Sequence, residues 1–182
     1  PDLTAWRQFV QRVVNPTHRV RIGVVGKYIE LQDAYKSIYE ALVHAGAAND
    51  TKVEVVKVDA ENIEKAGPEA YLGGLQGILV PGGFGSRGTR GMMKASEYAR
   101  EHGVPFFGIC YGFQWATVEY ARNVCGLEGA DSTEVDENAP HKVIYKLRDL
   151  LGVDELGGTM RLGRYACELA PGSHAQRIYG ET

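Results

Sequence analysis

The sequence predicts an α/β fold: an open, mostly parallel twisted sheet with helices on both faces, plus a small C-terminal hairpin region. Three observations indicate this fold. Short apolar runs alternate with helical patterns through the first 124 residues. The runs show little polar alternation, which is typical of strands buried on both faces. Strands and helices that alternate at this spacing favour parallel pairing through right-handed crossovers.

The first part of the chain predicts three helical segments and two strands. Apolar residues at helical spacing predict an amphipathic first helix, which Asn15 and Pro16 end. Asp33 is the predicted N-cap of the second helix. That helix is expected to face inward through Tyr35, Ile38, Tyr39, Leu42 and Val43. The elements are a helix over 2–14, a strand over 19–25, a helix over 34–47, a strand over 53–58 and a helix over 60–72, broken around Gly67 and Pro68.

The second part predicts two further strands, each followed by a helix. A strand over 77–80 leads into the glycine-rich segment 81–85, and a helix over 91–101 stops at Gly103. The ends of the two strands are expected at the same edge of the sheet. The remaining predicted elements are a strand over 104–109, a helix over 112–124, a polar loop over 128–140, a hairpin over 157–169 and a short helix over 173–179.

Composition is ordinary for a soluble globular domain. The 182 residues are 44% hydrophobic and 24% charged, with a formal net charge of −3. This charge gives no electrostatic reason to expect a nucleic-acid partner, and no apolar run is long enough to span a membrane. The spacing of Cys110, Cys125 and Cys167 is too wide for a zinc site or a disulfide framework. We therefore expect no bound metal, and we expect a reducing, cytoplasmic setting.

The segment Gly108-Ile109-Cys110-Tyr111-Gly112 carries the strongest chemical signal. A buried strand ends, a nucleophile follows at once and a helix begins, which is the context of a nucleophile elbow. The turn is expected to strain the backbone of Cys110, and the close crossing of strand and helix explains the glycines on either side. At the helix N-terminus the thiolate form is favoured. Such a thiolate can attack a carbonyl carbon.

Attack on a carbonyl requires donors for the oxyanion that forms. The N–H of Tyr111 is one candidate, and Gly82 or Gly83, at the end of the neighbouring strand, can present a second. A cysteine after an apolar strand is otherwise a buried, inert residue. Cys125 and Cys167 lack the flanking glycine pattern and are interpreted as structural. The convergence of two strand ends on one reaction favours catalysis at Cys110.

Two segments resemble the class I glutamine amidotransferases: VPGGFGSRG at 80–88 resembles their oxyanion motif, and GICYGFQ at 108–114 their nucleophile motif. Other segments narrow the resemblance to the CTP synthase family. These are residues 1–6, 25–28, 33–35, 119–124, 131–134 and 157–163. The resemblance covers essentially the whole chain and implies a flavodoxin-like sheet.

The resemblance implies a C-terminal glutaminase domain that hydrolyses L-glutamine at a cysteine. Ammonia then passes to a synthase domain of the same polypeptide, where ATP phosphorylates UTP and ammonia displaces phosphate to give CTP. ATP, UTP and Mg²⁺ belong to that domain, and no cofactor is expected in this one. GTP is the implied allosteric activator, and the full-length enzyme is an implied cytoplasmic homotetramer in pyrimidine biosynthesis.

The resemblance also assigns roles to individual residues. Cys110 is the nucleophile, and the backbone N–H groups of Gly83 and Tyr111 are the oxyanion donors. Glu134 suits the α-ammonium of glutamine, although a solvated loop carboxylate is the simpler interpretation of that residue. The implied glutamine-binding set is Gly83, Tyr111, Gly112, Phe113, Gln114 and Glu134. The implied GTP contacts are Phe84, Arg87 and Gly88.

The sequence departs from the family pattern in two places. Tyr111 and Phe113 stand where the family has Leu and Met, so the pocket can differ in shape while the backbone role is kept. The family's catalytic His-Pro-Glu segment is not found, since the histidines are His18, His44, His102, His141 and His174. We therefore interpret residues 1–16 as a linker helix from an absent synthase domain and 17–182 as a C-terminally incomplete amidotransferase domain that hydrolyses glutamine weakly or not at all.

Two alternatives stay open on sequence grounds. One is another class I amidotransferase or a cysteine hydrolase of the same architecture. The other is a non-catalytic regulatory module that keeps the fold for binding. Labelling of Cys110 by a glutamine-mimicking electrophile separates the catalytic alternatives from the last one.

Overall fold

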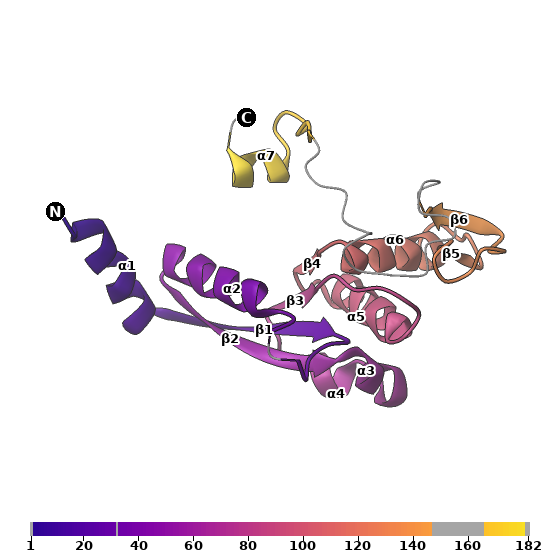
Figure 1. Cartoon of the computed structure of the whole chain (residues 1–182), viewed down its shortest axis with the longest axis horizontal. Coiled ribbons are helices and arrows are strands. Elements are labelled where there is room, and N and C mark those ends of the chain that lie inside the picture. The colour runs from indigo at the N-terminus through magenta and orange to yellow at the C-terminus, as the bar shows by residue number, and fades with distance from the viewer. Residues whose placement is uncertain (1, 32, 147–165, 181–182) are drawn as a thin grey trace. The chain divides into compact units, whose positions relative to one another are not determined.

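The structure is a computed structural model that describes residues 2–31, 33–146 and 166–180 (Figure 1). The chain divides into two compact units, residues 1–147 and 148–182. Each unit is described by itself below.

The first unit is built on a parallel sheet of four strands. The strands are β1 (His18–Gly26), β2 (Thr51–Asp59), β3 (Gly77–Val80) and β4 (Phe106–Gly108). Their order is β2-β1-β3-β4, and each neighbouring pair is parallel. The predicted fold class is confirmed, and the carboxyl ends of β3 and β4 lie side by side as expected. β4 is shorter than the predicted strand over 104–109.

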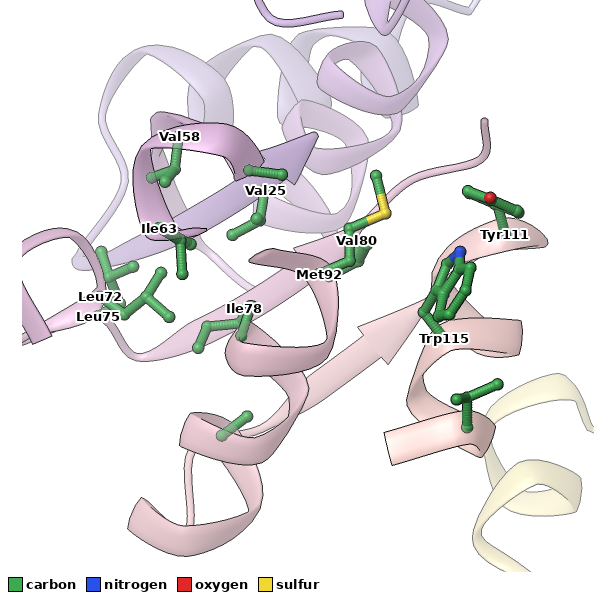
Figure 2. Close-up of a cluster of buried hydrophobic side chains, with 14 residues drawn as sticks. Val25, Val58, Ile63, Leu72, Leu75, Ile78, Val80, Met92, Tyr111 and Trp115 are labelled. Carbon is green, nitrogen blue, oxygen red and sulfur yellow. The ribbon is translucent and has the colours of Figure 1, made fainter. Parts of the chain in front are cut away.

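Helices cover both faces of this sheet. They are α2 (Lys36–Ala48), α3 (Ala60–Ala66), α4 (Glu69–Leu72), α5 (Thr89–His102) and α6 (Tyr111–Asn123). The first helix, α1 (Thr4–Val14), has no buried residue and contacts α2 through Phe9 and His44. On one face, Val24 and Leu79 pack against Tyr35 and the apolar stripe of α2. On the other face, Val25, Ile78 and Val80 pack against residues of α3, α5 and α6 (Figure 2). Adjacent strand residues thus serve opposite cores, which explains the continuous apolar runs.

Helix α2 differs from the sequence prediction in two respects, its N-cap and the orientation of Val43. The N-cap is Tyr35 and no side chain caps the helix, so the predicted cap at Asp33 is wrong. Tyr35 is only 3% exposed and its hydroxyl accepts a hydrogen bond from the Tyr28 N–H, so core packing decides where the helix begins. Val43 is 45% exposed, because it lies beside the stripe formed by Tyr35, Ile38, Tyr39 and Leu42.

The predicted loop over 128–140 contains a strand that the sequence did not indicate. β5 (Ala130–Ser132) pairs in parallel with β6 (His141–Ile144) in a separate two-stranded sheet. The Arg122 guanidinium on α6 donates to the Ala130 carbonyl at 2.5 Å and to the Asp131 carboxylate at 2.8 Å. These contacts hold β5 beside α6. The sequence did not indicate β5 because its three residues are too few to show the alternating pattern of a strand.

The described part of the second unit contains one helix, α7 (His174–Tyr179). Its N-cap is Ser173, whose hydroxyl accepts from the Gln176 N–H at 3.1 Å, and the predicted helix over 173–179 is confirmed. Of the predicted hairpin over 157–169, residues 157–165 lie outside the described residues, and 166–169 form no strand. Among the described helices, none has the length and apolar character needed to cross a membrane.

Candidate active site

Cys110 occupies the turn between β4 and α6. It is the N-cap of α6, with φ 53° and ψ −107°, and its side chain is exposed. A positive φ is costly for a residue with a Cβ, typically about 1–3 kcal/mol. Both predicted properties, a strained backbone and an accessible sulfur, are therefore confirmed.

The flanking glycines are required by close packing. A Cβ on Gly108 would lie 2.6 Å from the Phe113 nitrogen, and a Cβ on Gly112 would lie 2.1 Å from the Val80 carbonyl oxygen. Neither position has room for a methyl group, and in both cases the obstacle is backbone, which cannot turn aside. The G-x-C-x-G spacing is thus the signature of a helix that begins directly against two strand ends.

The glycine-rich loop that follows β3 lies against Cys110. A Cβ on Gly82 would be 3.6 Å from the Cys110 Cβ, which is ordinary contact distance. The Ile109 N–H donates to the Val80 carbonyl at 2.9 Å and joins the two strand ends. Within the described residues, no acceptor is found for the backbone N–H groups of Gly83 and Tyr111. The oxyanion role of these two N–H groups stays a prediction.

Glu134 also reaches this loop, from the segment after β5. Its Oε1 accepts from the Gly85 N–H at 2.8 Å, although 49 residues separate the two. The structure thus brings Glu134 together with the predicted oxyanion loop, rather than leaving it as a solvated loop carboxylate. Gln114 lies on the first turn of α6, half-buried, and its N–H donates to the Cys110 carbonyl at 3.0 Å.

Tyr111 and Phe113 have opposite environments on α6. The Tyr111 side chain is 1% exposed, packs edge-on against Trp115 (Figure 2) and donates its hydroxyl hydrogen to the Gly85 carbonyl at 2.5 Å. Burial raises the pKa of the Tyr111 phenol, so the hydroxyl keeps the proton that it donates. Phe113 is 62% exposed and lines an apolar surface groove on α6.

Sequence reasoning missed Lys27 as a residue of this site. Lys27 follows β1 and is 5% exposed, and its ammonium group donates to the Phe84 carbonyl and, at 3.2 Å, to the Gly85 carbonyl. The same ammonium lies 5.4 Å from the centre of the Tyr111 ring. Burial, and then the charge of Arg87, lowers the pKa of Lys27. The only sequence signal was the VGKY segment, which gave no indication of what the lysine contacts.

The predicted GTP contacts are split between two environments. The Phe84 carbonyl faces Lys27, whereas Arg87 and Gly88 line a polar cavity of about 420 Å³ beside the loop. The Arg87 guanidinium donates to Glu61 at 2.5 Å and to the Lys27 carbonyl at 2.8 Å. The other lining residues include Glu64, Arg90, Trp115, Arg122 and Asp131. Arg87 therefore joins the loop after β3 to the loop after β1.

Exposure alone does not distinguish Cys110, since Cys125 and Cys167 are exposed free thiols as well. They are not the buried core residues that a structural interpretation suggests. What distinguishes Cys110 is its backbone strain and its contact with the glycine loop. Across residues 2–31, 33–146 and 166–180, no histidine is hydrogen-bonded to Cys110, and no group of three His, Cys, Asp or Glu side chains is arranged to hold a metal ion.

The model of the family described as "Glutamine amidotransferase class-I" matches residues 30–179, which include the elbow, the glycine loop and Glu134. The chain belongs to the class I glutamine amidotransferase family. The resemblance expected from the motifs at 80–88 and 108–114 is thereby confirmed.

Curated proteins that are similar to this chain include CTP synthases. The chain is 56% identical to the CTP synthase of Koribacter versatilis, covering all of this chain and 33% of that protein. It is 54% identical to the CTP synthase of Methanocaldococcus jannaschii, covering 99% of this chain and 34% of that protein. The chain therefore spans about a third of the length of the curated relatives that it matches.

A solved structure in this amidotransferase family has the same fold. It is the Trypanosoma brucei CTPS glutaminase domain with bound acivicin, which matches with a TM-score of 0.64 and 37% identity. The match covers 69% of this chain and 49% of that one. The predicted relation to the glutaminase domain of CTP synthases is confirmed.

Proposed function

We propose that this chain is a glutamine-hydrolysing domain that supplies ammonia to a CTP synthase, with Cys110 as its nucleophile. The observation that carries the proposal is the exposed, strained Cys110 in contact with the glycine loop after β3. Strain of this kind persists only where the surrounding structure enforces it. Here the enforcement comes from Gly108 and Gly112, which let α6 begin directly against β3 and β4.

The chemistry is acyl transfer through a thioester. The Cys110 thiolate attacks the side-chain amide carbon of glutamine, and the carbonyl π electrons move to the oxygen. The N–H groups of Gly83 and Tyr111 stabilise that oxyanion, each contributing about 3 kcal/mol to lowering the barrier. The tetrahedral intermediate collapses, the C–N bond breaks and the nitrogen leaves as ammonia after taking up a proton. Water then hydrolyses the γ-glutamyl thioester to glutamate and restores the thiol.

Substrate binding is assigned to groups at the rim of the same loop. Glu134 binds the α-ammonium of glutamine through a charge-assisted hydrogen bond, while its Oε1 accepts from Gly85. Gln114 is positioned by the first turn of α6 and is half-buried there. Phe113, which is 62% exposed, is assigned an apolar contact with the bound glutamine.

The wider role follows from the relatives. CTP synthases are about three times as long as this chain, and the T. brucei glutaminase domain binds acivicin. The proposed partner is a synthase domain of the same polypeptide, which uses ATP, UTP and Mg²⁺ in a cytoplasmic homotetramer. GTP is proposed as an activator that meets the loop at Phe84, Arg87 and Gly88. Arg87 would have to exchange its contact with Glu61 for a phosphate group.

The 182-residue chain is expected to hydrolyse glutamine weakly. Among its described residues, none supplies a histidine base within hydrogen-bond reach of the Cys110 sulfur. Proton transfer by a positioned base contributes about 10²- to 10⁴-fold to such reactions, so turnover should be reduced by that order. Alkylation of the Cys110 sulfur by a reactive electrophile, in which the thiolate displaces a halide and forms a thioether, does not need that base and should still occur.

Selective labelling tests the proposal. The chain is incubated with acivicin or with a chloromethyl ketone analogue of glutamine, and each thiol is followed by peptide mass spectrometry. The three exposed cysteines provide an internal comparison. We expect labelling of Cys110 that excess glutamine prevents, with Cys125 and Cys167 unlabelled, whereas iodoacetamide should label all three. Equal labelling of the three thiols, or no labelling of Cys110 in a folded chain, would refute the proposed function and favour a non-catalytic module.

A further inference from the structure

The peptide units of Gly85 are held by side chains from three separate segments. Lys27, after β1, donates to the Gly85 carbonyl at 3.2 Å, and Tyr111, at the start of α6, donates to the same carbonyl at 2.5 Å. Glu134, after β5, accepts from the Gly85 N–H at 2.8 Å. Gly85 has φ +71°, a conformation that favours glycine. The middle of the glycine loop is therefore fixed by contacts that lie far apart in sequence.

Lys27 is committed to this loop rather than to solvent. Its ammonium group is buried with the side chain, and burial disfavours the charged form. The charge is compensated by two loop carbonyls and by the faces of the Tyr28 and Tyr111 rings, at 5.8 Å and 5.4 Å. A long, flexible side chain is thus immobilised to bind Phe84 and Gly85, the two residues that follow Gly83.

Tyr111 contributes to the loop through its side chain as well as through its backbone. Its hydroxyl hydrogen is directed to the Gly85 carbonyl, while its N–H has no acceptor among the described residues. A side chain without a hydroxyl at this position could not make that bond. In this chain the residue beside the nucleophile is therefore also bonded to the loop that carries the second oxyanion donor.

We propose that Lys27 and the Tyr111 hydroxyl are positioning residues that fix the glycine loop with the Gly83 N–H beside Cys110. The inference rests on the proposed function. A loop with glycine at positions 82, 83 and 85 has wide conformational freedom, and an oxyanion donor is effective only when it is held in place before the reaction. Because Lys27 and Tyr111 both donate to the Gly85 carbonyl, they stabilise the same conformation of the loop.

The test compares two electrophiles on the 182-residue chain. The chloromethyl ketone analogue of glutamine must place its carbonyl oxygen in the oxyanion site, whereas iodoacetamide needs only an accessible thiolate. For Tyr111→Phe and Lys27→Met we expect the rate of Cys110 labelling by the chloroketone to fall about tenfold. This is a smaller loss than the roughly 100- to 1,000-fold that removing an oxyanion donor outright typically causes. The iodoacetamide rate should change by less than about twofold, because Cys110 stays exposed.

Matched variants separate positioning from general damage. Lys27→Arg keeps a cationic donor and should restore part of the chloroketone rate. Tyr120→Phe removes a hydroxyl from an exposed tyrosine on the same helix and should leave both rates unchanged. In the double variant Tyr111→Phe/Lys27→Met the losses should be less than multiplicative, since both residues act on one carbonyl. Tyr111→Phe deletes only one oxygen atom, so it remains informative if Lys27→Met does not fold.

The outcomes distinguish this inference from the proposed function. If the unmodified chain is labelled selectively at Cys110 but Tyr111→Phe and Lys27→Met react at its rate, the positioning role is wrong and the function stands. Parallel loss with both electrophiles would also overturn positioning, since it indicates a change at the thiol itself. If the unmodified chain shows no selective labelling, both proposals fail together.

Discussion

Substituting Gly112 by alanine tests whether α6 begins directly against the end of β3. The added Cβ would lie 2.1 Å from the Val80 carbonyl oxygen and 2.7 Å from its carbonyl carbon. Ordinary contact begins near 3.4 Å, so helix and strand must separate by about 1.3 Å. β3 lies between β1 and β4 and is held on both sides, so the helix has to move. Its N-cap, Cys110, would move with it.

The expected effect combines two opposing contributions. Overpacking of a close-packed contact costs about 3 kcal/mol, at the upper end of the usual range because the obstacle is backbone. Alanine in a helix is about 1 kcal/mol better than glycine. We expect the free energy of unfolding to fall by about 2 kcal/mol, which lowers Tm by about 4–8 °C in a chain of this size. A shift of the nucleophile by about 1 Å should slow chloroketone labelling of Cys110 by about 100-fold.

Urea denaturation followed by circular dichroism, together with labelling rates, measures both effects. Gly82→Ala is the control for stability, because its Cβ would meet the Cys110 Cβ at an ordinary 3.6 Å and Gly82 has no left-handed backbone. Its free energy of unfolding should change by less than about 0.5 kcal/mol. A Gly112→Ala variant as stable and as reactive as the unmodified chain would show that the elbow is not packed as described.

Three further predictions concern charged groups. Arg100→Met should lower the free energy of unfolding by about 3 kcal/mol, because the 2% exposed Glu119 carboxylate loses its cation and keeps only the hydrogen bond from the Asn123 amide. Arg19→Met, at an exposed ion pair, should cost less than about 0.5 kcal/mol in the same denaturation assay. Burial and neighbouring carboxylates raise the pKa of Glu97 above its usual 4.5, so stability should decline as pH rises through that raised value. Urea midpoints of Glu97→Gln should lack this decline. Glu134→Gln keeps an acceptor for the loop but loses the charge for an α-ammonium, so chloroketone labelling should slow by about tenfold or more while iodoacetamide labelling is unchanged.

The parts of the fold that the sequence predicted are those set by local pattern. The apolar run over 77–80 matches β3 residue for residue, and the break at Gly67 and Pro68 separates α3 from α4 as expected. Cys110 and its flanking glycines were predictable because strand, nucleophile and helix are adjacent in sequence, so one turn specifies the geometry. The stop at Gly103, with φ +64°, follows the same local logic.

The parts that could not be predicted depend on contacts between distant residues. In the sequence, Lys27 is simply a charged residue that follows a strand. Its hydrogen bonds to the carbonyls of Phe84 and Gly85, about 57 residues away, depend on the folded structure. The capping preference of Asp33 was overruled by the burial of Tyr35. Local propensity is a weak guide wherever a buried side chain contributes more than about 1 kcal/mol, the usual size of a cap.

The geometry at Cys110 has no explanation in stability. Holding a residue with a Cβ at φ 53° lowers the stability of the fold by about 1–3 kcal/mol. Because the Cys110 side chain is exposed, hydrophobic burial does not offset that loss. Glycine at position 110 would relieve that strain and still allow the turn. Cys125 is also exposed but has no positive φ, which shows that an accessible thiol on this fold does not require one. The packing of Gly108 and Gly112 enforces the strained backbone at Cys110. Because this strain lowers stability and serves only to present the sulfur, it indicates a site that exists for its chemistry.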